Sequence, residues 1–301
     1  MPRRPRLWFL CNLDVLWQVE IIMNKIYRTW SLMSACWQIL RKDKGLLLFP
    51  LVSGICCLLL LASFAIPLYA TNHWQPPGRG AETAQQVAYY GVLFLFYVCN
   101  YFVIIFFNAA IVACATIRMR GGEPTVGDGF RAAATRLPVI AGWAVLSATV
   151  GLVLRVIEDR SEKIGQIVSG LLGAAWTLVS FMVVPILVVE NKNPFTALKE
   201  STVMLKKTWG ERLAGSFSFG LIFFLLGIPA VVLIVLGFFS GSVAGIAGAI
   251  AVAVIYLMVL ALVQSALQAI FQAALYLYAR EGQVPEGFEA ELLGNAMIAR
   301  G

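Results

Sequence analysis

The sequence predicts an all-α fold: a polytopic membrane bundle of six transmembrane helices, arranged as three hairpins with cytoplasmic amphipathic helices. The composition is 60% hydrophobic and only 13% charged, whereas soluble domains carry about 25% charged residues. Six stretches are long and apolar enough to cross a hydrocarbon core of about 30 Å. The Lys and Arg residues gather on one side of these stretches, as they do in membrane proteins of fixed orientation.

The predicted spans differ in length, and two exceed what a simple crossing needs. The sixth has 38 residues, which reach about 57 Å at 1.5 Å per residue, so it must tilt, break or extend into the cytoplasm. Pro185 in the fourth span and Pro229 in the fifth predict kinks. The six spans are Leu46–Tyr69, Val87–Ile117, Leu137–Ile157, Ile164–Val189, Leu213–Phe239 and Ser242–Ala279.

The distribution of basic residues predicts the orientation. Nineteen of the 23 Lys and Arg residues lie before the first span, in the loops after the second and fourth spans, or in the tail. Arg79, Arg155, Arg160 and Lys163 lie on or near the opposite side. Because cytoplasmic loops carry the excess of positive charge, both termini are expected inside, in the cell (cytoplasmic) membrane.

The segments on the basic side read as amphipathic helices. Ile26–Leu40, Thr125–Arg136 and Pro194–Trp209 combine apolar and charged faces at helical spacing, which predicts interfacial helices. In the first of these, Trp30 and Trp37 are expected on the apolar face as membrane anchors.

The start of the chain does not read as a signal peptide. Its apolar stretch contains Asp14 and Glu20, and no small-residue cleavage site follows. We therefore expect two parts: an N-terminal extension over residues 1–22 and a membrane domain over 23–301. The extension is either an upstream over-extension of the reading frame or a surface-lying arm.

An internal repeat links the second and sixth spans. A shift of 164 residues superimposes Phe107–Ala110 on Phe271–Ala274 and pairs Asn100 with Gln264. Each segment then runs into a turn containing Gly and Pro, and the fourth span exits similarly through Asn193 and Pro194. Such repeats are common in transporter folds, and they also arise by duplication in membrane proteins without a transport role.

The repeat-related spans carry amides within apolar surroundings. Since amides facing lipid are unfavourable, they should face the interior of the bundle. They either join the two helices by hydrogen bonds or line a polar pathway or ligand-contacting strip. The candidate strip consists of Asn100, Asn108, Gln264, Gln268 and Gln272.

No pattern in the sequence predicts an enzyme. HExxH, GxSxG and P-loop motifs are missing, and no Asp, Glu or His lies in the middle of a span, which disfavours proton-coupled transport. The six cysteines form no CxxC motif, so we expect no metal site, no cofactor and no catalytic residue.

Several runs carry a resemblance to a known family. Over roughly Met23 to Phe288, the chain resembles an uncharacterised family of prokaryotic six-helix integral membrane proteins. Its layout is more distantly similar to the membrane domain fused to some glycerophosphodiester phosphodiesterases, whose soluble catalytic domain has no counterpart here. The resemblance implies a six-helix fold and brings no functional residues. The runs are Ile26–Leu32, Leu40–Lys44, Leu48–Pro50, Ala197–Ser201, Lys207–Gly210 and Leu275–Ala279.

The sequence is compatible with two functions. The leading one is a membrane-organising or accessory protein that binds lipid or another membrane protein; the alternative is a transporter or permeation subunit for a small solute or lipid. The basic loops predict contact with anionic lipids at the cytoplasmic face. A membrane-protein partner or a homo-oligomer is a further expectation. Topology explains the positive charge, so no nucleic-acid partner is expected.

Overall fold

The computed structural model describes residues 30–70, 82–160, 164–209, 218–282, 284–285 and 288, and within these it contains helices and no strands. A helical segment over residues 30–42 comes first. The later elements are η1 (Lys44–Leu47), α2 (Leu48–Ala70), α3 (Thr83–Met119), α4 (Val126–Thr135), α5 (Leu137–Arg160), α6 (Ile164–Val179), α7 (Val183–Glu190), α8 (Pro194–Trp209), α9 (Ser218–Phe239) and α10 (Val243–Glu281).

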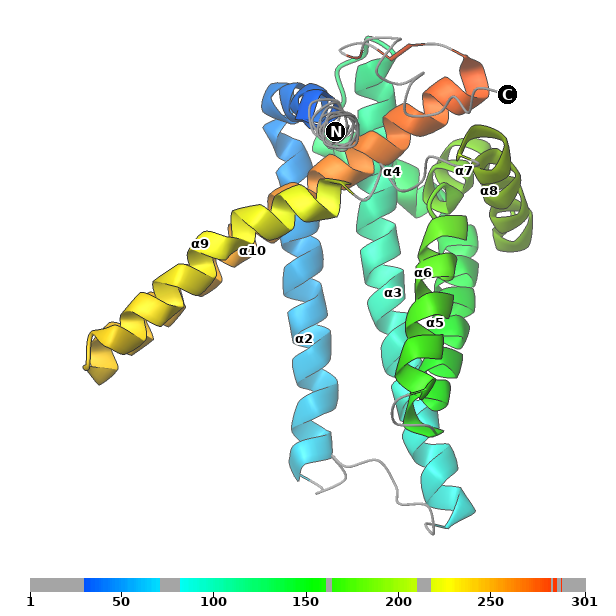
Figure 1. Ribbon diagram of the computed structural model, residues 1–301. Helices are drawn as coiled ribbons and strands as arrows, with labels where there is room; N and C mark the ends of the chain where they lie inside the picture. Colours follow the sequence, from blue (N-terminus) through cyan, green and yellow to red (C-terminus); the bar gives the residue numbers. More distant parts are fainter. Residues whose placement is uncertain are drawn as a thin grey trace, which may run out of the picture.

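Six helical stretches of the described chain are long and apolar enough to cross a membrane, which confirms the predicted fold class. They form the hairpins α2–α3, α5–α6/α7 and α9–α10, which all open toward the same end (Figure 1). Each predicted span contains a helix. The fifth is described only from Ser218, because residues 210–217 lie outside the described chain, as does the predicted extension over 1–22.

The predicted amphipathic helices all lie at that shared end, which we call the basic end: segment 30–42, α4 and α8 (Figure 1). In the first, Leu32, Cys36 and Ile39 are buried, whereas Trp30 and Trp37 are 58% and 43% exposed. The tryptophans therefore lie outside the buried stripe of this helix, which follows the 32–36–39 spacing. Their role as membrane anchors stays a prediction.

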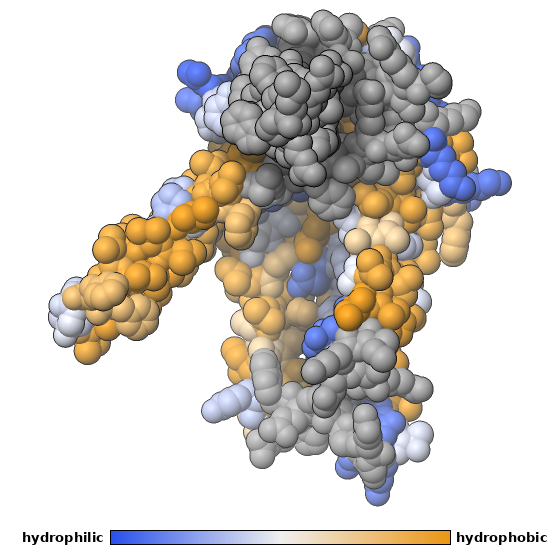
Figure 2. Space-filling model, in the orientation of Figure 1, coloured by the Kyte–Doolittle hydropathy of each residue, from blue (hydrophilic) through white to orange (hydrophobic). Residues whose placement is uncertain are grey.

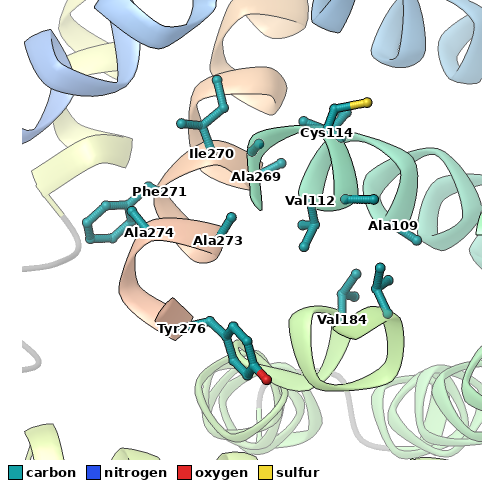
Figure 3. Packing of buried hydrophobic residues seen from close by; sticks show 14 of the residues in the cluster. Ala109, Val112, Cys114, Val184, Ala269, Ile270, Phe271, Ala273, Ala274 and Tyr276 are labelled. Atoms are coloured by element: carbon teal, nitrogen blue, oxygen red, sulfur yellow. The ribbon is translucent and has the colours of Figure 1, made fainter. Parts of the chain in front are cut away.

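The core forms where the basic-end parts of α3, α7 and α10 meet (Figure 3). The repeat motifs contribute small side chains here: Ala109 and Ala110 from α3, and Ala273 and Ala274 from α10, are fully buried. Small residues let membrane helices approach closely and gain van der Waals contact. The repeated sequence therefore builds the contact surface between the second and sixth spans.

The fourth span is broken rather than kinked at its proline. The helix stops after Val179 and restarts at Val183, which places Pro185 in the first turn of α7, where a missing N–H is harmless. Ser201 of α8 fills the break. Its hydroxyl donates to the carbonyl of Val179 (2.6 Å) and accepts from the N–H of Met182 (3.2 Å). The freed backbone groups are thus satisfied inside the protein, as a membrane interior requires.

The third hairpin inclines away from the other two and projects from the bundle as an arm (Figure 1). The 39 residues of α10 run without a break, which excludes one of the three outcomes predicted for this helix and leaves tilt and extension into the cytoplasm. Gly237 packs so tightly against α10 that a Cβ atom there would lie 2.4 Å from the Cβ of Ala249. Tyr256 donates a hydrogen bond to the carbonyl of Leu226 (2.7 Å). These contacts hold the two helices of the arm together.

Candidate functional site

A cavity of about 320 Å³ lies at the joint between the arm and the first hairpin. The first two turns of α2 form one wall, the basic-end half of α3 a second, and the middle of α10 a third. At about 30 Å³ per water molecule, it has room for roughly ten waters or a small polar headgroup. Its lining residues are Pro50, Ser53, Ile104, Phe107, Asn108, Ile111, Ala261, Gln264, Ser265, Gln268, Ala269 and Gln272.

The structure brings four of the five predicted amide residues to this cavity: Asn108, Gln264, Gln268 and Gln272. Asn100 does not line it. Asn100 lies eight residues before Asn108, about 12 Å farther along α3, where the inclined α10 has moved away from α3 (Figure 1). The strip is therefore split, and only its basic-end part surrounds the space.

Local sequence explains why the glutamines point to one space. Residues four apart lie on neighbouring positions of a helix face, so Gln264, Gln268 and Gln272 form a continuous stripe. The small side chains of Ala261 and Ala269 lie within the same lining and leave room beside them. On α3, Phe107 and Ile111 add apolar side chains to the lining beside Asn108. The cavity thus combines polar hydrogen-bonding groups with an apolar frame, which is typical of small-molecule sites.

Sequence reasoning missed the contribution of α2. Pro50 and Ser53 complete the cavity, but Pro50 entered the prediction only as part of a resemblance. The one signal available was Ser53, a polar residue within an apolar stretch. A single serine in a span is common, so its position carries little information without the packing of α2 against α3.

Gln272 is the most unusual member of the lining. It is 8% exposed, and its Oε1 is the one buried side-chain oxygen or nitrogen of the described residues that has no hydrogen-bond partner. Leaving a buried polar group unpaired costs about 1–3 kcal/mol. Native proteins keep few such groups, and each calls for an explanation.

The cavity lining contains no ionisable side chain. Charged residues of the basic end instead pair with one another. Arg118 of α3 binds Asp43, and Arg120 binds Glu281 at the end of α10. The amides and the hydroxyls of Ser53 and Ser265 are therefore the polar side-chain groups of this lining.

The polar stripe of α10 continues beyond the cavity into an ion-pair network. Tyr276 and Arg280, four and eight residues after Gln272, both bind Glu190 at the end of α7, each at 2.7 Å. Lys192 bridges Glu190 and Glu200, with contacts of 2.6 Å to each. The hydrogen bonds to Glu190 and then Glu200 raise the pKa of Lys192. This network anchors the basic end of α10 to α7 and α8.

The described residues contain no group of three or more His, Cys, Asp and Glu side chains that could hold a metal ion. Five of the six cysteines are described, and all five are free thiols. Cys36 is fully buried, and burial raises its pKa. It is therefore an unreactive thiol under ordinary conditions.

Comparison with known proteins places the chain among membrane proteins without an assigned activity. Residues 87–287 match the model of a family described as a family of unknown function (DUF6159). The match runs from α3 past the end of α10 and so includes every cavity residue except Pro50 and Ser53. No curated protein matches the chain, and the distant resemblance to the membrane domain of glycerophosphodiester phosphodiesterases gains no support. The match covers more than half of the sequence, and the chain belongs to this DUF6159 family.

Proposed function

We propose that this chain is a membrane accessory protein that holds the polar part of a lipid in the cavity between α2, α3 and α10. The observation that carries the proposal is the cluster of four amides around a space of about 320 Å³, one of them with a buried, unpartnered oxygen. Amides placed there only to join helices would be expected to bond to one another. The oxygen of Gln272 has no such partner.

The surroundings of the cavity favour a lipid over a water-soluble ligand. Beyond the cavity, α2 and α10 diverge (Figure 1) and expose apolar side chains such as Ile55, Leu58 and Ile255. Figure 2 shows hydrophobic surface along the arm and along the bundle. A polar group at the joint and an apolar chain along the diverging helices would match the two halves of a lipid molecule.

The depth of the cavity is compatible with a lipid headgroup. Pro50 and Ser53 lie in the first two turns of α2, close to the basic end. The excess of Lys and Arg at that end supports a cytoplasmic position for it and for both termini, in the cytoplasmic membrane. On this orientation the cavity lies near the inner membrane surface. Anionic lipids would gather around the basic end itself, outside the cavity, at about 1 kcal/mol per basic residue near the surface.

Lipid retention tests the proposal. Wild-type protein and the double variant Gln268→Leu/Gln272→Leu are purified in mild detergent, and the lipid that remains bound is measured by native mass spectrometry. Gln166→Leu is a matched control, because Gln166 is exposed on α6, remote from the cavity lining. We expect wild type and Gln166→Leu to retain a lipid that the double variant loses. Equal retention by all three would refute lipid binding at this cavity.

A transporter or permeation subunit is the second candidate. The observation that favours it is the continuous polar stripe on α10, which leads from Gln264 in the cavity to Arg280 at the basic end. Such a stripe could guide a small solute between the cavity and the cytoplasm. A substrate-dependent flux in proteoliposomes that Gln268→Leu abolishes would support transport. A flux no higher than that of empty liposomes, together with lipid retention, would favour the accessory role.

A further inference from the structure

A second cavity, of about 370 Å³, lies between α8 and the end of α10 at the basic end, and we call it the α8 groove. At about 30 Å³ per water molecule, it has room for roughly twelve waters or for a phosphate with its neighbouring atoms. Ala279 and Arg280 line it from α10. The residues on the other side recur at helical spacing and so form one face of α8: Thr196, Lys199, Glu200, Val203 and Met204.

The carboxylate in this lining, that of Glu200, is already neutralised. Its two oxygens receive Nζ of Lys192 at 2.6 and 2.7 Å, and Oε2 also receives Nη2 of Arg280 at 3.2 Å. Both cations also bind Glu190. Together with Lys199, three cations accompany two carboxylates, so this cluster keeps one positive charge. The groove therefore attracts an anion despite the presence of a carboxylate.

Several hydrogen-bond donors remain unused around this positive charge. Among the described residues, Lys199 forms no ion pair, and its ammonium carries three N–H donors. Arg280 binds both of its carboxylate partners through Nη2, which leaves the N–H groups of Nε and Nη1 for a further acceptor. The hydroxyl of Thr196 adds another donor. A phosphate group suits this set, because its oxygens accept several hydrogen bonds and it pairs readily with Arg and Lys.

The apolar part of the groove favours a lipid as the source of the phosphate. Val203, Met204 and Ala279 line the groove beside the charged groups. Phe195 and Val203 lie about one turn to either side of Lys199 and are 71% and 43% exposed. A soluble phosphate would leave these side chains in contact with water, whereas the chains of a lipid would cover them. The excess of Lys and Arg at the basic end supports a position at the inner membrane surface, where phosphate headgroups lie.

We infer that the α8 groove binds the phosphate of an anionic phospholipid, with Lys199 and Arg280 as its positive partners. The groove shares no lining residue with the cavity between α2, α3 and α10, so this binding goes beyond the proposed function. It gives a specific position to the anionic lipid that is expected at the basic end. The bound lipid lies against the ion-pair network that holds α10 to α7 and α8.

Two lysines of α8 provide a matched test. Lys206 lies seven residues after Lys199, on the same side of the helix and about 10 Å farther along it. It is exposed like Lys199 but does not line the groove. Lys199→Gln and Lys206→Gln each remove one positive charge from the same helix. General attraction of anionic lipids predicts equal effects of the two changes, whereas a site in the groove predicts an effect of Lys199→Gln alone.

The affinity of phosphatidylglycerol for delipidated, full-length protein in an uncharged detergent is measured by native mass spectrometry. We expect Lys199→Gln to bind about fivefold more weakly than wild type and Lys206→Gln to stay within about twofold, the scale of one exposed charge contact. Lys199→Arg should bind like wild type, because it keeps the charge and the donors. The loss caused by Lys199→Gln should be the same when Gln268→Leu/Gln272→Leu is also present.

Two further ligands identify the source of the phosphate. A diacylglycerol with the same acyl chains has no phosphate, so its affinity should not change in Lys199→Gln. Glycerophosphoglycerol is the headgroup of phosphatidylglycerol without the acyl chains, and an equal concentration of it should not displace the lipid. Displacement by this soluble headgroup would show that the groove takes a free phosphate ester, and a weaker binding of diacylglycerol to Lys199→Gln would show that the phosphate is not recognised. Either result would overturn the inference.

Failure of this inference and failure of the proposed function give different results. If Lys199→Gln and Lys206→Gln weaken phosphatidylglycerol equally, or if neither does, the groove is not a specific site, while lipid binding in the cavity is unaffected. If Gln268→Leu/Gln272→Leu alone weakens phosphatidylglycerol, the lipid lies in the cavity and the inference is wrong. If Lys199→Gln alone weakens it and the cavity variant retains every lipid that wild type retains, the inference holds and the proposed function is refuted.

Discussion

Tyr276 donates a hydrogen bond of 2.7 Å to Glu190 and so joins the sixth span to the end of the fourth. The phenol is 1% exposed, and the carboxylate also receives Arg280 and Lys192. Tyr276 follows Gln272 by one helical turn, so the same stretch of α10 forms both the cavity and the anchor. The attachment of α10 to α7 therefore lies one helical turn from the cavity.

Replacing Tyr276 with Phe should weaken this anchor without changing the packing of the ring. A hydrogen bond to a charged group contributes about 1.5–3 kcal/mol, and we expect a loss of about that size in the free energy of unfolding. Thermal unfolding in detergent measures it. In a double-mutant cycle with Glu190→Gln, the two changes should be far from additive. Additive effects would show that the two residues are not coupled.

Ser201→Ala should destabilise the junction between α6 and α7. The hydroxyl is the partner of the Val179 carbonyl and of the Met182 N–H, and an unpaired buried group costs about 1–3 kcal/mol. Ser169→Ala is the matched control, because the hydroxyl of Ser169 binds the carbonyl of Gln166 in its own helix and is exposed. Amide hydrogen exchange of residues 176–186 should increase only in the first variant. Equal exchange in both variants would contradict a capping role for Ser201.

Gly129 lies where α4 presses against α2 and α3. A Cβ atom there would lie 2.6 Å from Cζ of Phe49, 2.7 Å from Sγ of Cys114 and 3.0 Å from the carbonyl oxygen of Ala110. Gly129→Ala should therefore lower the free energy of unfolding by about 1–3 kcal/mol through overpacking. Gly127→Ala, whose Cβ would approach only Oγ1 of Thr125 at 3.7 Å, should be neutral. Equal stability of the two variants would contradict this packing.

The start of α4 should loosen in acid. Asp128 and Thr125 form a capping box, and the side-chain and backbone hydrogen bonds from Thr125 lower the pKa of Asp128 below its usual 3.8. Because the pKa of Asp128 is lower in the folded state, its carboxylate stabilises the fold fully at any pH above its unfolded-state pKa. This stabilisation is lost as the pH falls through the folded-state pKa of Asp128. The protection factors of residues 126–131, which are exchange rates relative to the intrinsic rate at each pH, should thus be constant above about pH 5 and fall below pH 4. Asp128→Asn should remove this pH dependence.

The fold class and the glutamine stripe could be predicted because both follow from periodic sequence. Apolar length gives the spans, and the spacing of Gln264, Gln268 and Gln272 gives a shared face whatever packs against it. Asn100 lies outside the cavity lining because α10 is inclined to α3, and no local sequence pattern encodes that inclination. Similarly, Pro185 indicated an irregular fourth span, but the break at 180–182 depends on a hydroxyl from α8, supplied by Ser201. Contacts between distant segments therefore account for most of what the sequence alone could not provide.

The position of the bound lipid is the central claim, and photoaffinity labelling tests it most directly. A diacylglycerol with a diazirine next to its headgroup is incorporated into nanodiscs with the wild-type protein, irradiated, and mapped by peptide mass spectrometry. We predict labelling of residues 104–111 and 261–272, with loss of this signal in Gln268→Leu/Gln272→Leu and not in Gln166→Leu. Labelling spread evenly over the exposed apolar residues of α9, with no enrichment at the cavity, would contradict the account.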